Sequence, residues 1–307
     1  MDNMLKDCKT YYGAIDIGSN AVRLLIKCVE EDEQGKVFFS KVLLLRVPLR
    51  LGFDVFAMGK ISETKEKNML RLMKVFHHLM KIYDVEDYRA CATSAMRDAK
   101  NGSVVLKNIE KDTGIHIDVI DGKEEAAIIY NNHMECITDR TGNYMYVDVG
   151  GGSTEINFLT NGELIYSNSY NIGTVRMLSN AVDEEAWITL REDLTKLYEF
   201  YPNINLIGSG GNINKLFRLA EKKDKKLQRM TISSLEDLYE ALKILPLEER
   251  VKQFKLKMDR ADVIIPAAEI YLFIANIVKP EYIYVPIIGL SDGIIDNLLL
   301  EEKQEEN

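Results

Sequence analysis

Two segments of this chain carry an aspartate followed by a short glycine-rich turn: Asp16-Ile17-Gly18-Ser19-Asn20 and Asp148-Val149-Gly150-Gly151-Gly152. Each turn lies between two apolar runs that are typical of paired strands. The backbone N–H groups of such a turn can bind phosphate oxygens. The aspartate at the strand end can hold a hard cation such as Mg²⁺. The pattern therefore predicts a phosphate site built from two similar strand–turn–strand segments.

The second turn carries more information than the first. Gly-Ser-Asn turns are common in hairpins, so Gly18–Asn20 alone is also consistent with an ordinary turn. Three consecutive glycines before Ser153 cost backbone entropy, and a close approach of the backbone to a ligand is a good reason for them. Asp148 and Glu155 flank this turn on the two arms of one predicted hairpin. Both carboxylates can then share one divalent cation, and a solvated hairpin tip is the alternative.

Four further residues could contribute to such a site. Gly210 and Gly211 lie between a predicted strand and a predicted helix, where free N–H groups can receive an anion. Arg97 follows a strand end and could hold a phosphate with two hydrogen bonds, although a surface salt bridge fits equally well. Glu125 lies in the first turn of a predicted helix, where the helix dipole alone favours an acidic residue.

The elements that must position these residues form two similar series. The first series predicts strands at 11–17, 21–29, 37–47, 85–92 and 116–120, and helices at 62–83, 102–113 and 122–134. The series restarts at Tyr144 with a hairpin and a third strand at 163–168, followed by helices at 183–200, 211–221 and 260–278, a strand at 282–285 and a helix at 291–301. Strands and helices in this order predict an α/β fold.

Composition limits the function classes. The chain has 307 residues, 46% hydrophobic and 28% charged, and a net charge of −9. These values are typical of a globular protein of two domains and argue against non-specific nucleic-acid binding. The cysteines, at positions 8, 28, 91 and 136, lack metal-binding spacing and are expected to be reduced thiols. With a polar N-terminus and no apolar run of about 18 residues, we expect a cytoplasmic protein that does not enter membranes.

The order of motifs resembles that of the exopolyphosphatase / guanosine pentaphosphate phosphohydrolase (Ppx/GppA phosphatase) family. The matching pieces are AIDIGSNAVRLLI, RLGFDVFAMGKIS, ATSAMRDAKNG, VIDGKEEAAIIYN, YVDVGGGSTEI, NIGTVRM, IGSGGNINKL, RADVIIPAAEI and GLSDGII. They appear in the family's order and span residues 14 to 295. Nine motifs in register are a specific signal, whereas one would be weak.

The resemblance implies two ribonuclease-H-like lobes of the actin-like ATPase superfamily with a cleft between them. We expect the first lobe at 1–130, joined by a C-terminal helix at 291–307, and the second at 131–290. The implied reaction is the release of terminal orthophosphate from inorganic polyphosphate or guanosine pentaphosphate. By position, Glu125 activates water and Arg97 binds substrate phosphate. Metal ligands are Asp148 and Glu155, with Asp16 adjoining, and the phosphate-binding backbone belongs to Gly18, Ser19, Asn20, Gly150, Gly151, Gly152, Ser153, Gly210 and Gly211.

The resemblance leaves several alternatives. Guanosine tetraphosphate is a further expected ligand, and a homodimer is left open. An alarmone-binding sensor and an ATP-dependent kinase of the same superfamily remain competing interpretations. Longer family members carry an additional helical C-terminal region that is not found after the second lobe here. We therefore expect short polyphosphates to be favoured over long ones.

Overall fold

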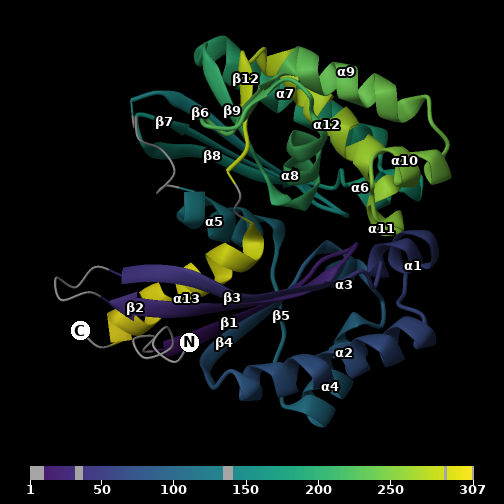
Figure 1. The fold of residues 1–307 in the computed structure, drawn as a ribbon, viewed down its shortest axis with the longest axis vertical. Coiled ribbons are helices and arrows are strands. Elements are labelled where there is room, and N and C mark those ends of the chain that lie inside the picture. Colours follow the sequence, from purple (N-terminus) through teal and green to yellow (C-terminus); the bar gives the residue numbers. More distant parts are fainter. Residues whose placement is uncertain (1–9, 32–36, 134–140, 287–288, 306–307) are drawn as a thin grey trace. The chain divides into compact units, whose positions relative to one another are not determined.

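The computed structural model describes residues 10–31, 37–133, 141–286 and 289–305. The chain groups into two compact units (Figure 1). Unit 1 contains Met1–Asp121 together with Leu290–Asn307, and unit 2 contains Gly122–Gly289. The chain therefore leaves the first unit, forms the second, and returns to the first with its last helix.

Unit 1 is built on a five-stranded sheet of order β3-β2-β1-β4-β5. Its strands are β1 (Thr10–Ile17), β2 (Val22–Glu31), β3 (Val37–Val47), β4 (Val85–Ala92) and β5 (Asp118–Val119). The first three strands are antiparallel, and β4 and β5 run parallel to β1. Its helices are α1 (Leu51–Met58), α2 (Glu63–Ile82), α3 (Ser94–Asp98), α4 (Gly102–Thr113) and α13 (Leu290–Glu305).

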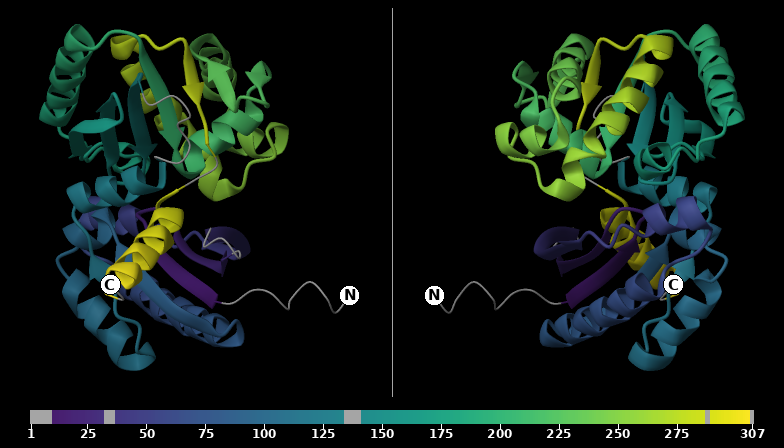
Figure 2. Two further views of the ribbon diagram at one scale, coloured as in Figure 1. Left: turned by 90° about the vertical axis from the view of Figure 1, so that its left-hand side faces the viewer. Right: turned by 90° about the vertical axis from the view of Figure 1, so that its right-hand side faces the viewer.

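The long helix α2 shows how the sequence specifies this unit. The hydroxyl of Ser62 accepts a hydrogen bond from the Lys65 N–H and so caps the helix. Met69, Met73 and Phe76 recur at helical spacing and are buried in the core of the unit. The last helix, α13, contacts β1, β2 and β4, and Figure 2 shows it against these strands.

Unit 2 contains a seven-stranded sheet of order β10-β11-β12-β9-β6-β7-β8. Its strands are β6 (Asn143–Val149), β7 (Thr154–Thr160), β8 (Glu163–Tyr170), β9 (Ile204–Ser209), β10 (Lys223–Asp224), β11 (Arg229–Thr231) and β12 (Tyr282–Tyr284). Its helices are α5 (Gly122–His133), α6 (Thr174–Leu178), α7 (Glu184–Phe200), α8 (Gly210–Leu219), α9 (Ile232–Lys243), α10 (Leu247–Gln253), α11 (Met258–Ala261) and α12 (Ile264–Val278).

The two sheets repeat one topology. The order β3-β2-β1-β4-β5 in unit 1 corresponds to β8-β7-β6-β9-β12 in unit 2, with an antiparallel meander on one side and parallel strands on the other. The expected α/β class, with a ribonuclease-H-like sheet in each unit, is confirmed. The small hairpin β10–β11 extends the second sheet at its edge.

Several element boundaries differ from the sequence predictions. The division between the units lies at Asp121/Gly122 and not after residue 130, because α5 packs against β7 and β8 of unit 2. The predicted helix 260–278 is two helices, α11 and α12. The predicted strand 116–120 contains only two strand residues, and α1 was not predicted.

Of two expectations drawn from composition, the one on membranes stays a prediction and the one on cysteines is wrong in part. Met258–Val278 is long and apolar enough to cross a membrane by length and composition, although 61% of its most apolar window is buried, as in a core helix. Cys91 is a buried thiol, but Cys28 is disulfide-bonded. The prediction of a reduced thiol is therefore wrong for Cys28, and Cys8 and Cys136 lie outside the described residues.

Candidate active site

Four side chains form a continuous row across four neighbouring strands of unit 2. Asp148 in β6 lies opposite Glu155 in β7, Ser209 in β9 lies opposite Asp148, and Ser169 in β8 lies opposite Glu155. Directly opposed residues share one face of a sheet. Ser209 Oγ donates to Asp148 Oδ2 at 2.7 Å, and Ser169 Oγ donates to Glu155 Oε1 at 2.9 Å. We call these four residues the carboxylate row.

Glycines allow two helices to begin directly against this row. A Cβ atom on Gly210, the first residue of α8, would lie 2.6 Å from Asp148 Oδ1, and its φ of +87° also favours glycine. A Cβ atom on Gly122, the first residue of α5, would lie 2.3 Å from Ser169 Cβ. Each end of the row therefore meets the N-terminus of a helix.

A buried tyrosine supports the row from the core. Tyr271 in α12 is fully buried, and its hydroxyl lies 2.9 Å from the Val147 carbonyl and 3.2 Å from the Ser209 carbonyl. Burial raises the pKa of Tyr271 well above its ordinary value, and the negative charges of Asp148 and Glu155 add to this effect. The phenol therefore stays a neutral donor. Its position in an apolar helical run gave no sequence signal of this role.

Hydrogen bonds from α6 hold the glycine turn between β6 and β7. Its carbonyls accept hydrogen bonds from the start of α6: Gly150 from Thr174 N at 3.0 Å, Gly151 from Val175 N at 2.8 Å, and Gly152 from Arg176 Nε at 2.7 Å. In a trans peptide the N–H points opposite to the carbonyl. The N–H groups of Gly151, Gly152 and Ser153 therefore point away from α6, as an anion site requires.

The first turn uses the same arrangement in unit 1. The carbonyl of Ser19 accepts from Gly52 N at 2.8 Å, and the carbonyl of Asn20 accepts from Arg50 N at 2.9 Å. Here α1 plays the part that α6 plays in unit 2. The backbone N–H of Gly18 donates to the Ala21 carbonyl at 3.1 Å and closes the turn.

The equivalent row in unit 1 carries the opposite charge. Asp16 in β1 lies opposite Arg23 in β2, which lies opposite Arg46 in β3. The Asp16 carboxylate forms an ion pair with Arg23, and Ser291 Oγ lies 3.5 Å from Asp16 Oδ2. Where unit 2 has Asp, Glu and Ser, unit 1 has Asp, Arg and Arg. The predicted metal ligand Asp16 is therefore paired in this structure with the guanidinium of Arg23.

Glu125 lies on the same face of unit 2 as the carboxylate row. It occupies the first turn of α5 and is 8% exposed. The next residue, Ala126, accepts a hydrogen bond through its carbonyl from Asn157 Nδ2 at 2.8 Å. Asn157 and Glu155 are two residues apart on β7 and share one face. The structure thus brings the helical turn of Glu125 onto the face that carries Glu155 and Asp148.

The remaining predicted residues have structural contacts of their own. Arg97 in α3 donates from Nη1 to the Ile120 carbonyl at 2.9 Å. Asn212, next to Gly211, donates from Nδ2 to the Val149 carbonyl at 3.1 Å, which ties the α8 turn to the end of β6. Arg260 Nη1 in turn donates to Asn212 Oδ1 at 3.2 Å. Gly210 and Gly211 therefore lie beside the second glycine turn, whereas Arg97 supports the backbone that precedes α5.

Comparison with known proteins identifies the family. Residues 28–302 match the Ppx/GppA phosphatase family. The chain belongs to this family. A Ppx/GppA family member from Aquifex aeolicus has a similar fold, with a TM-score of 0.74 and 27% identity over 95% of this chain and 98% of that chain.

Two curated relatives are considerably longer. A guanosine-5'-triphosphate,3'-diphosphate pyrophosphatase of Aeromonas salmonicida is 25% identical over 94% of this chain and 59% of its own length. A bifunctional 3-dehydroquinate synthase/phosphatase of Fusobacterium nucleatum is 29% identical over 68% of this chain and 34% of its own length. This Ppx/GppA chain therefore spans between about a third and about three fifths of the length of these relatives.

Proposed function

We propose that this protein is a Mg²⁺-dependent phosphohydrolase that releases terminal orthophosphate from inorganic polyphosphate or guanosine pentaphosphate. The observation that supports it most strongly is the carboxylate row with Glu125 on the same face of the sheet. Family membership and the names of the relatives support the phosphoanhydride substrate class. The cytoplasmic location remains a prediction.

The donor set of the carboxylate row fits Mg²⁺. Asp148 and Glu155 supply hard carboxylate oxygens, and the hydroxyls of Ser209 and Ser169 orient them. Among the described residues, no three His, Cys, Asp or Glu side chains are grouped to hold an ion. Mg²⁺ is commonly held by one or two carboxylates and completes its coordination with substrate phosphates and water. A two-carboxylate site is therefore what a phosphate-dependent Mg²⁺ site requires.

Each group of residues then has a distinct part in the reaction. When bound, Mg²⁺ neutralises charge on the substrate phosphate and so favours phosphoryl transfer. Within each unit, the N–H groups of the glycine turn hold phosphate oxygens. Glu125 accepts a proton from the attacking water as a general base. Arg23, whose side chain is 30% exposed, offers a positive charge for a further phosphate.

Parallel assays of phosphate release test this proposal. The purified protein is given tripolyphosphate, long-chain polyphosphate and guanosine pentaphosphate, each with Mg²⁺ and each with excess chelator. We expect orthophosphate release from at least one substrate, and its loss with chelator. Tight binding of guanosine pentaphosphate without any release would instead favour an alarmone-binding sensor. Phosphate transfer from ATP to a second substrate would favour a kinase.

A further inference from the structure

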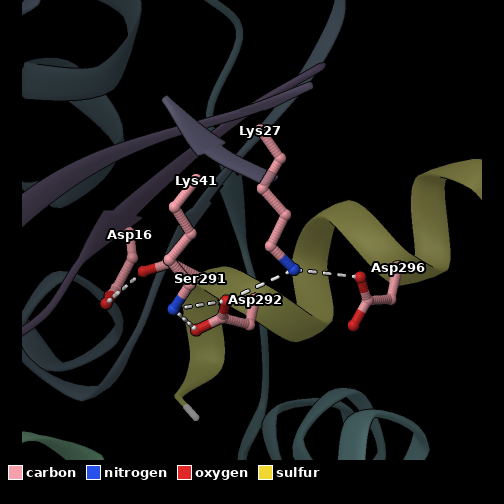
Figure 3. Close-up of polar contacts among 6 residues, drawn as sticks. All are labelled: Asp16, Lys27, Lys41, Ser291, Asp292 and Asp296. Carbon is pink, nitrogen blue, oxygen red and sulfur yellow. Dashed lines mark hydrogen bonds and ion pairs between the residues drawn. The ribbon is translucent and has the colours of Figure 1, made fainter. Parts of the chain in front are cut away.

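Ion pairs centred on a buried lysine join the last helix to the sheet of unit 1. Lys27 in β2 is 5% exposed, and its Nζ lies 3.2 Å from Asp292 Oδ1 and 3.1 Å from Asp296 Oδ1. The two aspartates are four residues apart on α13 and therefore share one face of the helix. Figure 3 shows these side chains together with their neighbours Asp16, Lys41 and Ser291.

The two lysines in this cluster differ in environment. Lys41 in β3 also contacts Asp292, at 2.9 Å, but its side chain is 45% exposed. Exposed ion pairs contribute little to stability. Removing either aspartate would take one carboxylate away from the buried Lys27 ammonium, and breaking a buried ion pair is strongly destabilising. The position of the first turns of α13 therefore depends on Lys27 far more than on Lys41.

This fastened turn presents one hydroxyl to the row of unit 1. Ser291, next to Asp292, is 6% exposed and places its Oγ 3.5 Å from Asp16 Oδ2 (Figure 3). The same carboxylate oxygen receives the guanidinium of Arg23. Asp16 is 2% exposed, so its orientation depends on these contacts. In unit 2 the equivalent aspartate, Asp148, likewise receives a serine hydroxyl.

We propose that Ser291 is a positioning residue that orients the Asp16 carboxylate and, through it, the Arg23 guanidinium that receives substrate phosphate. The Lys27–Asp292–Asp296 cluster holds Ser291 in place. This inference rests on the proposed function, because Arg23 matters only if a phosphorylated substrate binds. It adds the last helix to the residues that control substrate affinity, although that helix is far away in the sequence.

The first experiment separates positioning from general stability. Tripolyphosphate hydrolysis is measured for Ser291→Ala, for the conservative Ser291→Thr, and for Ser40→Ala as a control at an exposed serine of β3. We expect Ser291→Ala to raise KM about 2-fold to 10-fold, the range that one net hydrogen bond corresponds to, with kcat nearly unchanged. Ser291→Thr should restore KM. An unchanged KM in Ser291→Ala, or an equal fall in kcat, would overturn the proposal.

The route through Asp16 is tested by a double-mutant cycle. In an Asp16→Asn background, Ser291→Ala should have no further effect on KM, because the two residues act as one unit. The same cycle on urea unfolding needs no activity, and a coupling between the two substitutions is expected there as well. Independent effects in both measurements would contradict the proposal. If the wild-type protein releases no phosphate, the proposed function fails, and the unfolding cycle still decides whether Ser291 holds Asp16.

A matched pair of lysine variants tests the ion-pair cluster. Lys27→Met should lower the urea midpoint and raise KM for tripolyphosphate at a temperature where the variant is folded. Lys41→Met should change neither. A Lys27→Met protein that is less stable but keeps the wild-type KM would show that the cluster does not position Ser291.

Discussion

Asp148 and Glu155 lie directly opposite each other on β6 and β7, and each accepts a serine hydroxyl from the next strand outward. Two like charges at opposed positions repel each other. Such a pair is costly without a compensating cation. The arrangement therefore has a direct physical consequence, which is that a divalent cation should stabilise this unit.

We predict that Mg²⁺ raises the melting temperature of the protein and that Asp148→Asn and Glu155→Gln reduce this rise. Ligands that bind the folded state stabilise it in proportion to the logarithm of their concentration. Both variants should also need more Mg²⁺ for half-maximal phosphate release. Asp193→Asn, at a carboxylate of α7 bonded to Tyr166 and Tyr170, serves as the control. Titration curves that superimpose for wild type and both row variants would place the cation elsewhere.

We predict that Glu125→Gln keeps the fold and substrate binding but loses most turnover. Removal of a general base typically costs about 10²-fold to 10⁴-fold in rate. Glutamine keeps the size of the side chain, so circular dichroism and the binding of tripolyphosphate should match the wild type. The neighbouring Glu124→Gln is the matched control, since it shares the first helical turn. Full activity of Glu125→Gln would refute its assignment.

We predict that Gly173→Ala disturbs the second glycine turn. A Cβ atom at this position would lie 2.5 Å from the backbone of Gly152, closer than real contacts allow. The turn must therefore shift, which lowers substrate affinity and costs about 1–3 kcal/mol of stability, as overpacking does. Gly289→Ala is the control, because a Cβ atom there meets nothing within 4 Å. If Gly173→Ala keeps the wild-type KM and urea midpoint, the contact between residue 173 and Gly152 does not disturb the turn.

We predict a pH-dependent contribution to stability from His116. Its hydrogen bond with Glu110, helped by the charges of Glu110 and Asp118, raises the pKa of His116 above its ordinary value. Because the pKa of His116 is higher in the folded state, protonated His116 stabilises the fold. This contribution to stability is full below the pKa of the unfolded state, about 6.5, and is lost as the pH rises through the pKa of the folded state. His116→Gln should lower the urea midpoint slightly at pH 5.5 and leave it unchanged at pH 9.

The His116 effect should be small because the side chain is 70% exposed. Glu110→Gln removes the main partner and should reproduce the same pH pattern. A loss of stability that is equal at both pH values would mean that protonation of His116 is not its cause.

We predict that short polyphosphates or the nucleotide are hydrolysed in preference to long polyphosphate, with products released between turnovers. The net charge of −9 repels a long polyanion, and each phosphate held outside the site would need a positive partner. Gel analysis of long-chain substrate should therefore show intermediate lengths. Conversion of long chains to orthophosphate without intermediates would indicate a processive enzyme.

The sequence specified local features well where one physical signal dominated. The periodicity of residues 62–83 predicted α2, and the apolar runs on either side of the glycine turn predicted the hairpin that carries Asp148 and Glu155. It could not show the row itself. The serines in the row are brought in by strand register, which depends on the pairing of β8 and β9 with distant segments. The pairing of Arg23 with Asp16 likewise required the three-dimensional structure.

The return of α13 to unit 1 has a consequence for protein synthesis. Unit 2 is contiguous in the chain, so its elements are all available once residue 289 has been made. The strands of unit 1 are synthesised early, but the ion pairs of Lys27 form only after Asp292 and Asp296 have been synthesised. Domains generally fold as units while the chain emerges from the ribosome. We therefore expect unit 2 to have all of its elements available for folding before unit 1 does, although the synthesis of unit 1 begins first.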